Sequence, residues 1–287
     1  NIAKAIYKVG VNFFMCAIYL RAMLILLSPA KTLVLNAPIC NELASLPHHM
    51  TEAAELMTVL KAYTPSDLMK SMKLSKNLAE KVEDWHANWT THTSVGAAVK
   101  SKAKACAFAM KGEAFKFLDA PSLSNEDLQY AQKNLIVLSG LYGMLRPCDL
   151  IMPYRLEMGQ TFKVSQGHKS LNSFWSSVYR QAFSKKLKDQ ESKIILNLAS
   201  DEYSKVVIKS GIDAEIITCL FKEEGKNGFR TVSTFAKQAR GEMARFAIQN
   251  KIENVEKLKF FNNLRYTFNC DLSDSKNFIF TRPLINK

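Results

Sequence analysis

The segment Met23-Leu-Ile-Leu-Leu-Ser-Pro-Ala-Lys-Thr32 carries the clearest indication of the fold. It begins with an uninterrupted apolar run, and Ser28-Pro29 ends that run. A short apolar run closed by a turn-forming residue is typical of a buried strand in the middle of a sheet. We therefore predict a strand from Met23 to Leu27, followed by a polar turn that carries Lys31.

Two further apolar runs have the same form, at 135–138 and 194–198. The first leads into the polar segment 139–146, and the second ends in the polar segment 197–203. In open α/β sheets, ligands bind beyond the carboxyl ends of the strands. We therefore expect the three strand ends to meet at one cleft.

Candidate residues for this cleft follow directly after the strands. Lys31 and Arg146 would supply positive charge, and Ser28 would supply a hydroxyl group. Gly140 and Gly143 would permit a close approach of the backbone to an anion. This glycine pair matches neither of the common nucleotide-binding fingerprints, so no cofactor is predicted.

Acidic residues follow the third strand. Asp201 and Glu202 come after Ser200, at a position typical of a helix start. They have two interpretations, either capping and dipole compensation of that helix or a catalytic base in the cleft.

Two more groups of charged residues could reach the cleft. Arg155 could clamp a phosphate or carboxylate, with Glu157 as its partner, or the two could form an internal salt bridge. Lys237 and Arg240 belong to a second basic region, 226–251. A solvated basic helix face is the alternative there.

Helical and strand patterns alternate along the rest of the chain. We expect helices within 41–89, from Gly96 to about Met110, from Ser124, from Phe174 to Lys188 and from Ala236 to Gln249. We expect strands at Glu215–Phe221, Phe229–Phe235, Arg265–Cys270 and Asn277–Thr281, with a hairpin turn from Gly225 to Gly228. No repeat or linker interrupts this pattern. The sequence predicts a mixed α/β (α+β) fold, a single compact domain with a twisted mixed sheet surrounded by helices.

A lysine-rich segment within 61–116 contains ten lysines against five acidic residues. Residues 68–82, within an element of about 65–89, have the rhythm of a helix-hairpin-helix, in which backbone amides at the second helix's start meet a DNA phosphate. The predicted contacts are Lys70, Lys73, Ser75, Lys76 and Lys81. Lys73 and Ser75 replace the usual turn glycines, so an ordinary helical pair is the alternative.

The whole chain is strongly basic, with 39 Lys+Arg against 26 Asp+Glu and a formal net charge of +13. Such an excess attracts polyanions, although a solvated lysine-rich surface is the plainer interpretation. The six cysteines are scattered, which fits a reducing, cytoplasmic location, and the histidines show no ligand spacing. No structural metal is therefore expected.

Residues 1–22 combine early lysines with an apolar stretch that is short for a membrane span. We expect them to form an extension outside the fold, with a targeting peptide as the alternative. Residues 23–287 would then be one domain that makes no contact with a membrane.

Five segments together resemble the YaaA family of peroxide-stress proteins. They match the family's order and spacing from Met23 to about Arg282: 23–32, 138–147, 153–159, 197–203, and 236–241 with Arg245-Phe246. One departure is Lys111-Gly112-Glu113-Ala114-Phe115, where the family usually has Lys-Gly-Asp followed by an aromatic residue.

This resemblance implies a mixed α/β fold with a helix-hairpin-helix and a positively charged cleft. It also implies DNA binding and protection against hydrogen peroxide by limiting unincorporated iron. No catalytic motif is recognisable. The leading hypothesis is DNA binding without sequence preference, and the rival is an enzyme that acts on a small phosphorylated or nucleotide substrate at the strand ends.

Overall fold

The computed structural model describes residues 23–160, 164, 167–188, 193–226 and 228–283. The strands are β1 Leu24–Leu27, β2 Thr32–Leu33, β3 Lys104–Ala105, β4 Met110–Lys111, β5 Leu135–Ser139, β6 Gly143–Leu145, β7 Leu150–Ile151, β8 Ile194–Leu198, β9 Glu215–Gly225, β10 Gly228–Arg230, β11 Thr267–Phe268 and β12 Asn277–Pro283. The predicted extension at 1–22 lies outside the described residues.

Helices make up much of the remaining chain. The α-helices are α1 Met50–Leu60, α2 Pro65–Met72, α3 Lys76–Ala87, α4 Val95–Lys100, α5 Cys106–Ala109, α6 Glu113–Leu118, α7 Asn125–Asn134, α8 Leu171–Leu187, α9 Asp201–Lys209 and α10 Ser233–Gln249. Short 3₁₀ helices lie at η2 Asn41–Leu43, η3 Ala120–Ser122, η4 Val255–Phe260 and η5 Asn263–Arg265.

One mixed sheet forms the centre of the described part of the molecule. Its order is β11-β12-β9-β8-β1-β5-β6, with β10 paired to β9. The inner strands β5, β1, β8, β9 and β12 are parallel, whereas β6, β10 and β11 are antiparallel. β1 is wholly buried between β5 and β8, as its uninterrupted apolar run predicted. The predicted mixed α/β class is therefore confirmed.

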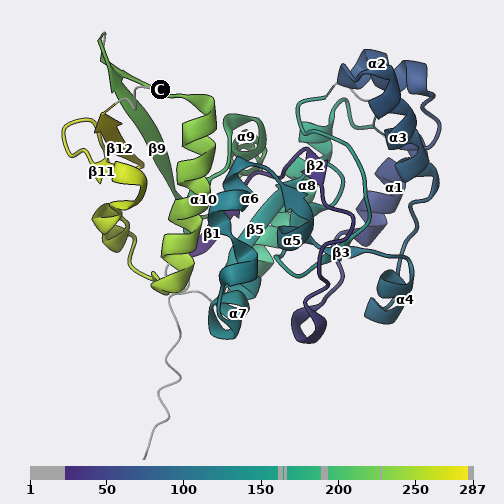
Figure 1. The fold of residues 1–287 in the computed structure, drawn as a ribbon, viewed down its shortest axis with the longest axis horizontal. Coiled ribbons are helices and arrows are strands. Elements are labelled where there is room, and N and C mark those ends of the chain that lie inside the picture. The colour runs from purple at the N-terminus through teal and green to yellow at the C-terminus, as the bar shows by residue number, and fades with distance from the viewer. Residues whose placement is uncertain (1–22, 161–163, 165–166, 189–192, 227, 284–287) are drawn as a thin grey trace, which may run out of the picture.

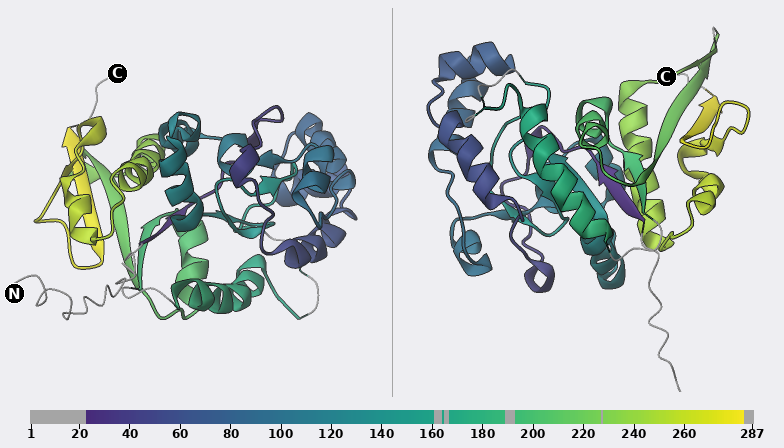
Figure 2. Two further views of the ribbon diagram at one scale, coloured as in Figure 1. Left: turned by 90° about the horizontal axis from the view of Figure 1, so that it is seen from below. Right: turned by 180° about the vertical axis from the view of Figure 1, so that it is seen from behind.

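Helices cover both faces of this sheet (Figures 1 and 2). α6, α7 and α10 lie on one face, and α8 and α9 lie on the other. The helices α1 to α4 gather at one end of the molecule, and β11, β12 and η4 lie at the opposite end. One hydrophobic cluster extends through these layers, which fits the expected compact single domain.

Capping residues explain where several helices begin. Thr64 and Asp67 form a reciprocal capping box at α2, whose first residue is Pro65. The Ser124 side chain accepts a hydrogen bond from the Asp127 backbone N–H at α7, as expected from the sequence. Such bonds satisfy backbone donors that a helix leaves unpaired at its first turn.

Three predicted elements were wrong in extent. The alanine-rich helix from Gly96 to Met110 is divided, because Lys104–Ala105 pairs with β7 and Met110–Lys111 pairs with β2. The strand predicted at 229–235 ends at Arg230, because α10 begins at Ser233. The strand predicted at 265–270 is reduced to Thr267–Phe268. In the first case, sheet pairing over long sequence distances outweighs the helix propensity of alanine.

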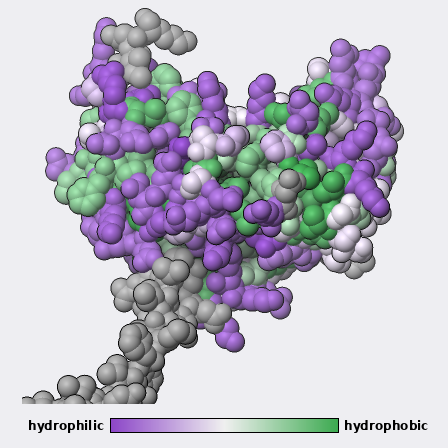
Figure 3. All heavy atoms as spheres, turned by 60° about the horizontal axis from the view of Figure 1, so that its bottom comes forward, coloured by the Kyte–Doolittle hydropathy of each residue, from purple (hydrophilic) through white to green (hydrophobic). Residues whose placement is uncertain are grey.

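Hydrophilic residues cover most of the face drawn in Figure 3, and hydrophobic residues are exposed there in smaller patches. Within the described residues, no helix combines the length and the apolar composition that crossing a bilayer requires.

Candidate anion-binding pocket and helix pair

A cavity of about 300 Å³ lies at the carboxyl ends of β1 and β8. These two strands are neighbours, but the chain continues from β1 towards β5 on one side and from β8 towards β9 on the other. Such a point of diverging connections is where open α/β sheets form ligand crevices. The walls come from residues after β1 and β8, from β4 and α6, from segment 154–157 and from α10.

Ser28 joins the ends of the two strands. Its hydroxyl oxygen accepts a hydrogen bond of 2.8 Å from the Ser200 backbone N–H. The Ser28 hydroxyl also lies 3.2 Å from the Ser200 hydroxyl. Ser28 therefore positions the start of α9 against the end of β1.

Segment 154–157 contributes an ion-pair network to the pocket. One carboxylate oxygen of Glu157 accepts a hydrogen bond of 2.9 Å from Arg155, and the other pairs with Lys31. Arg155 also reaches the carbonyl oxygen of Lys31 at 3.4 Å. The internal salt bridge of Arg155 to Glu157 is therefore observed, and it lies in the pocket wall. The binding of an external anion by Arg155 stays a prediction.

Helix α10 brings Lys237 and Arg240 to the same pocket. Arg240 is half-buried, and burial lowers the pKa of its guanidinium group from the usual value. Nε of Arg240 and Nε of Arg155 are both buried and have no hydrogen-bond partner among the described residues. The pocket wall therefore carries two unused guanidinium donors.

The Lys111-Gly112-Glu113 segment also lines the pocket, and the sequence had not assigned it there. Glu113 accepts a hydrogen bond of 2.5 Å from the Gln238 side chain on α10. A Cβ atom on Gly112 would lie 3.1 Å from the Cβ of Ala30. The glutamate at the family's usual aspartate position thus bridges α6 and α10. The Lys-Gly-Glu motif was the sequence signal from which this part of the pocket wall could have been predicted.

The two acidic residues of α9 have different environments. Glu202 lines the pocket and accepts a hydrogen bond of 2.9 Å from the Gly159 backbone N–H. The Asp201 side chain is 83% exposed and pairs with Lys205 at 3.4 Å, and it does not line the pocket. Of the two predicted candidates, only Glu202 could act on a ligand in this cavity.

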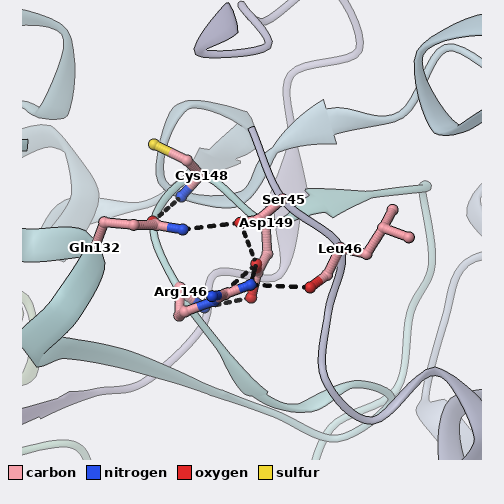
Figure 4. Close-up of polar contacts among 6 residues, drawn as sticks. All are labelled: Ser45, Leu46, Gln132, Arg146, Cys148 and Asp149. Carbon is pink, nitrogen blue, oxygen red and sulfur yellow. Dashed lines mark hydrogen bonds and ion pairs between the residues drawn. The ribbon is translucent and has the colours of Figure 1, made fainter. Parts of the chain in front are cut away.

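The prediction that Arg146 lines the cleft was wrong (Figure 4). The Arg146 guanidinium donates to buried Asp149 at 2.8 and 3.1 Å and to the Leu46 carbonyl at 3.1 Å. Ser45 and Gln132 complete this network, since Gln132 donates to Ser45 and Ser45 donates to Asp149. Asp149 therefore holds Arg146 in a structural role away from the pocket.

The predicted anion loop at Gly140 and Gly143 is also wrong. β5 turns back here into antiparallel β6, so its carboxyl end does not open into the cavity. A Cβ atom on Gly140 would lie 2.4 Å from the Leu156 carbonyl oxygen. At Gly143, φ is +67° and a Cβ atom would lie 2.3 Å from the Trp175 ring. Both glycines serve close packing.

The predicted DNA contacts lie apart from the pocket, on α2, α3 and the turn between them (Figure 1). Lys73 in this turn has φ of 53°, the left-handed conformation for which glycine is usual. Lys70, Lys73, Ser75, Lys76 and Lys81 are all exposed. The two helices and their tight turn are observed, and their identification as a helix-hairpin-helix stays a prediction.

His86 connects α3 to the pocket wall. This residue is 1% exposed, and its Nε2 accepts a hydrogen bond of 3.3 Å from the Arg155 backbone N–H. Burial lowers the pKa of His86 to about 4, so the imidazole is neutral at neutral pH. A neutral acceptor in α3 thus supports the segment that carries Arg155.

The fold and the pocket define a mixed α/β protein with a cationic pocket at the diverging strands of its sheet. The family model of the peroxide stress protein YaaA matches residues 23–272. The chain therefore belongs to the YaaA family of peroxide stress proteins, as the five sequence segments indicated.

Relatives are similar over most of this chain. A UPF0246 protein from Aliivibrio fischeri is 40% identical over 269 residues, which cover 92% of this chain and 100% of the relative. A UPF0246 protein from Saccharophagus degradans is 40% identical over 260 residues, covering 91% of this chain and 99% of the relative. One from Shewanella baltica is 39% identical with the same coverage.

Proposed function

We propose that this chain is a cytoplasmic DNA-binding stress protein that protects cells against hydrogen peroxide. The observation that carries DNA binding is the exposed lysine turn between α2 and α3. The seven-residue segment 70–76 contains Lys70, Lys73 and Lys76 and no acidic residue. Positive charge of this kind binds phosphates of any base sequence.

The start of α3 supports a phosphate contact at this turn. Ser75 is the N-cap residue, its side chain makes no capping hydrogen bond, and the first turn contains no acidic residue. The partial positive charge of the helix start is therefore not neutralised locally. Over the wider range 65–89, four lysines face four acidic residues, so the attraction is confined to the turn.

The test compares two triple variants that remove the same charge. The turn variant replaces Lys70, Lys73 and Lys76 with alanine. The control variant replaces three other exposed lysines with alanine: Lys133, Lys257 and Lys276. Duplex DNA binding is measured by fluorescence anisotropy from 50 to 200 mM salt. We expect the turn variant to lose at least about tenfold in affinity and up to about 2.7 from the magnitude of the salt slope, at about 0.9 per phosphate contact.

The control variant should lose no more than about threefold, because only the general field of the protein changes. Equal losses in the two variants would mean that the turn has no special role. Unchanged binding in both would refute the assignment of the helix pair to DNA.

The proposed limitation of unincorporated iron rests on family membership. We expect cells that lack the gene to accumulate more chelatable iron after a peroxide pulse than wild-type cells. Complementation with the intact chain should restore the iron level, and equal iron in both strains would exclude this role.

An enzyme acting on a small phosphorylated or nucleotide substrate is the second candidate. The position of the cavity between β1 and β8, with Glu202 in its wall, favours it. Its test is turnover of such compounds by the purified protein, with Glu202→Gln as the comparison.

A further inference from the structure

Two arginines that line the pocket at the strand ends each have a buried Nε–H group without a hydrogen-bond partner among the described residues. Nε of Arg155 and Nε of Arg240 belong to residues on different walls of the same cavity. Buried polar groups in folded proteins nearly always have a partner, so an unpaired one in a residue that lines a cavity calls for an explanation such as a bound ion or ligand. Each Nε–H group is suited to donate to an oxyanion.

The charge of the wall indicates how negative that ligand is. Five cationic and three acidic side chains line the cavity, which leaves a net charge of +2. The acidic residues are already engaged: Glu157 with Lys31 and Arg155, Glu113 with Gln238, and Glu202 with the Gly159 backbone. The surplus therefore matches a dianion.

Three of the five cations remain for that dianion. Lys111, Lys237 and Arg240 form no ion pair with a carboxylate within 4.0 Å in the described part of the chain. Lys111 and Lys237 are exposed, whereas Arg240 is half-buried. The start of α9 is less suitable as an anchor, because Asp201 and Glu202 occupy its first turn.

The remaining wall is apolar and indicates a ligand with an organic body. Leu27, Phe115, Tyr154 and Leu198 contribute to it, and its volume of about 300 Å³ is at the lower end for organic ligands. A phosphate group carries between about −1.5 and −2 charges at neutral pH when it is a monoester. A phosphodiester carries only one, as in the DNA backbone.

We propose that this pocket binds a small organic phosphomonoester, with its dianionic phosphate held by Arg240, Lys237 and Lys111 and its body against the apolar wall. This inference deepens the second candidate function by naming its substrate class. It is independent of DNA binding at the α2–α3 turn.

The experiment uses three probes that share one organic body. Adenosine 5′-monophosphate, cyclic 3′,5′-adenosine monophosphate and adenosine are titrated into the full chain at pH 7.5 by calorimetry. We expect the monoester to bind at least about tenfold more tightly than the cyclic diester or the nucleoside. Equal affinities for the three probes, or no monoester binding at 10 mM (roughly the limit of weak specific binding), would overturn the proposal.

Variants test the assigned residues. Arg240→Gln should lose at least about tenfold in monoester affinity, whereas Arg265→Gln, an exposed arginine on η5, should stay within about twofold. Circular dichroism checks the fold of each variant. If Arg240→Gln does not fold, Lys111→Ala and Lys237→Ala decide, since both side chains are exposed and each should lose at least about threefold.

A folded Arg240→Gln protein, or a pair of lysine variants, with wild-type monoester affinity would refute the site. Phosphorus NMR of the same samples follows turnover. Binding without turnover would support the phosphomonoester site and count against the enzyme, so the failures of the two ideas are distinguishable. The turn variant of Lys70, Lys73 and Lys76 should bind the monoester as the wild type does.

Discussion

His86 illustrates how one buried residue makes stability depend on pH. Its ring lies between α3 and the Arg155 segment, and its Nδ1 atom has no partner among the described residues. Protonation would place an uncompensated charge in this buried position. The folded protein therefore holds the pKa at about 4, below the ordinary value of 6.5.

We predict that the contribution of His86 to the free energy of unfolding is complete at pH 7 and is lost as the pH drops from 6.5 to about 4. In this window the unfolded chain binds a proton that the folded chain excludes. The shift corresponds to a loss of about 3 kcal/mol from this residue. Urea unfolding at several pH values measures it. His86→Gln should flatten the dependence, and His168→Gln should not; an unchanged slope in His86→Gln would contradict the assignment.

At the scale of elements, the contact between α6 and α10 holds the pocket together. Gly241 of α10 lies against α6, where a Cβ atom would come within 2.0 Å of the Ala114 carbonyl oxygen. Glu113 and Gln238 connect the same two helices. The close approach of α6 and α10 therefore determines the positions of Lys237 and Arg240 in the pocket wall.

We predict that Gly241→Ala lowers the free energy of unfolding by about 2 kcal/mol, because the helices must separate. Monoester affinity should fall as well, since Lys237 and Arg240 move with α10. Gly96→Ala is the matched control on α4. Nothing lies within 4 Å of its Cβ position, so this change should stabilise the protein by about 0.5–1 kcal/mol. Chemical denaturation compares the two, and a neutral Gly241→Ala would contradict the close packing.

At the scale of the whole molecule, the excess of positive charge is the feature that bears on the proposed DNA binding. The net charge is +13, whereas the helix pair itself is balanced between lysines and acidic residues. If the protein binds DNA as proposed, we expect its long-range field to attract the duplex and the lysine turn to make the closest phosphate contacts.

We predict that the affinity for DNA does not depend on base sequence and falls steeply as the salt concentration rises. Affinity for duplexes of unrelated sequence should agree within about threefold, and log Kd should rise linearly with log salt, by about 0.9 per phosphate contact. Anisotropy titrations with a panel of oligonucleotides measure both quantities. A flat salt response, or a strong preference for one duplex, would exclude electrostatic binding.

The sequence by itself determined which segments form the centre of the sheet and where several helices begin. Apolar runs such as Leu24–Leu27 are buried strands because the sheet is covered on both faces. Ser124 and Pro65 mark helix starts because capping acts within a few residues. Five family segments in order also identified the family.

The tertiary structure alone decided which strand ends form the pocket. Arg146 follows a buried strand, as Lys31 does, yet Asp149 and the Leu46 carbonyl hold it elsewhere. Glu113 and Gln238 meet across 125 positions of sequence. Local patterns report burial and chain direction, whereas a pocket is made of contacts between distant segments. Each such contact depends on how the helices and strands pack, which no short stretch of sequence specifies.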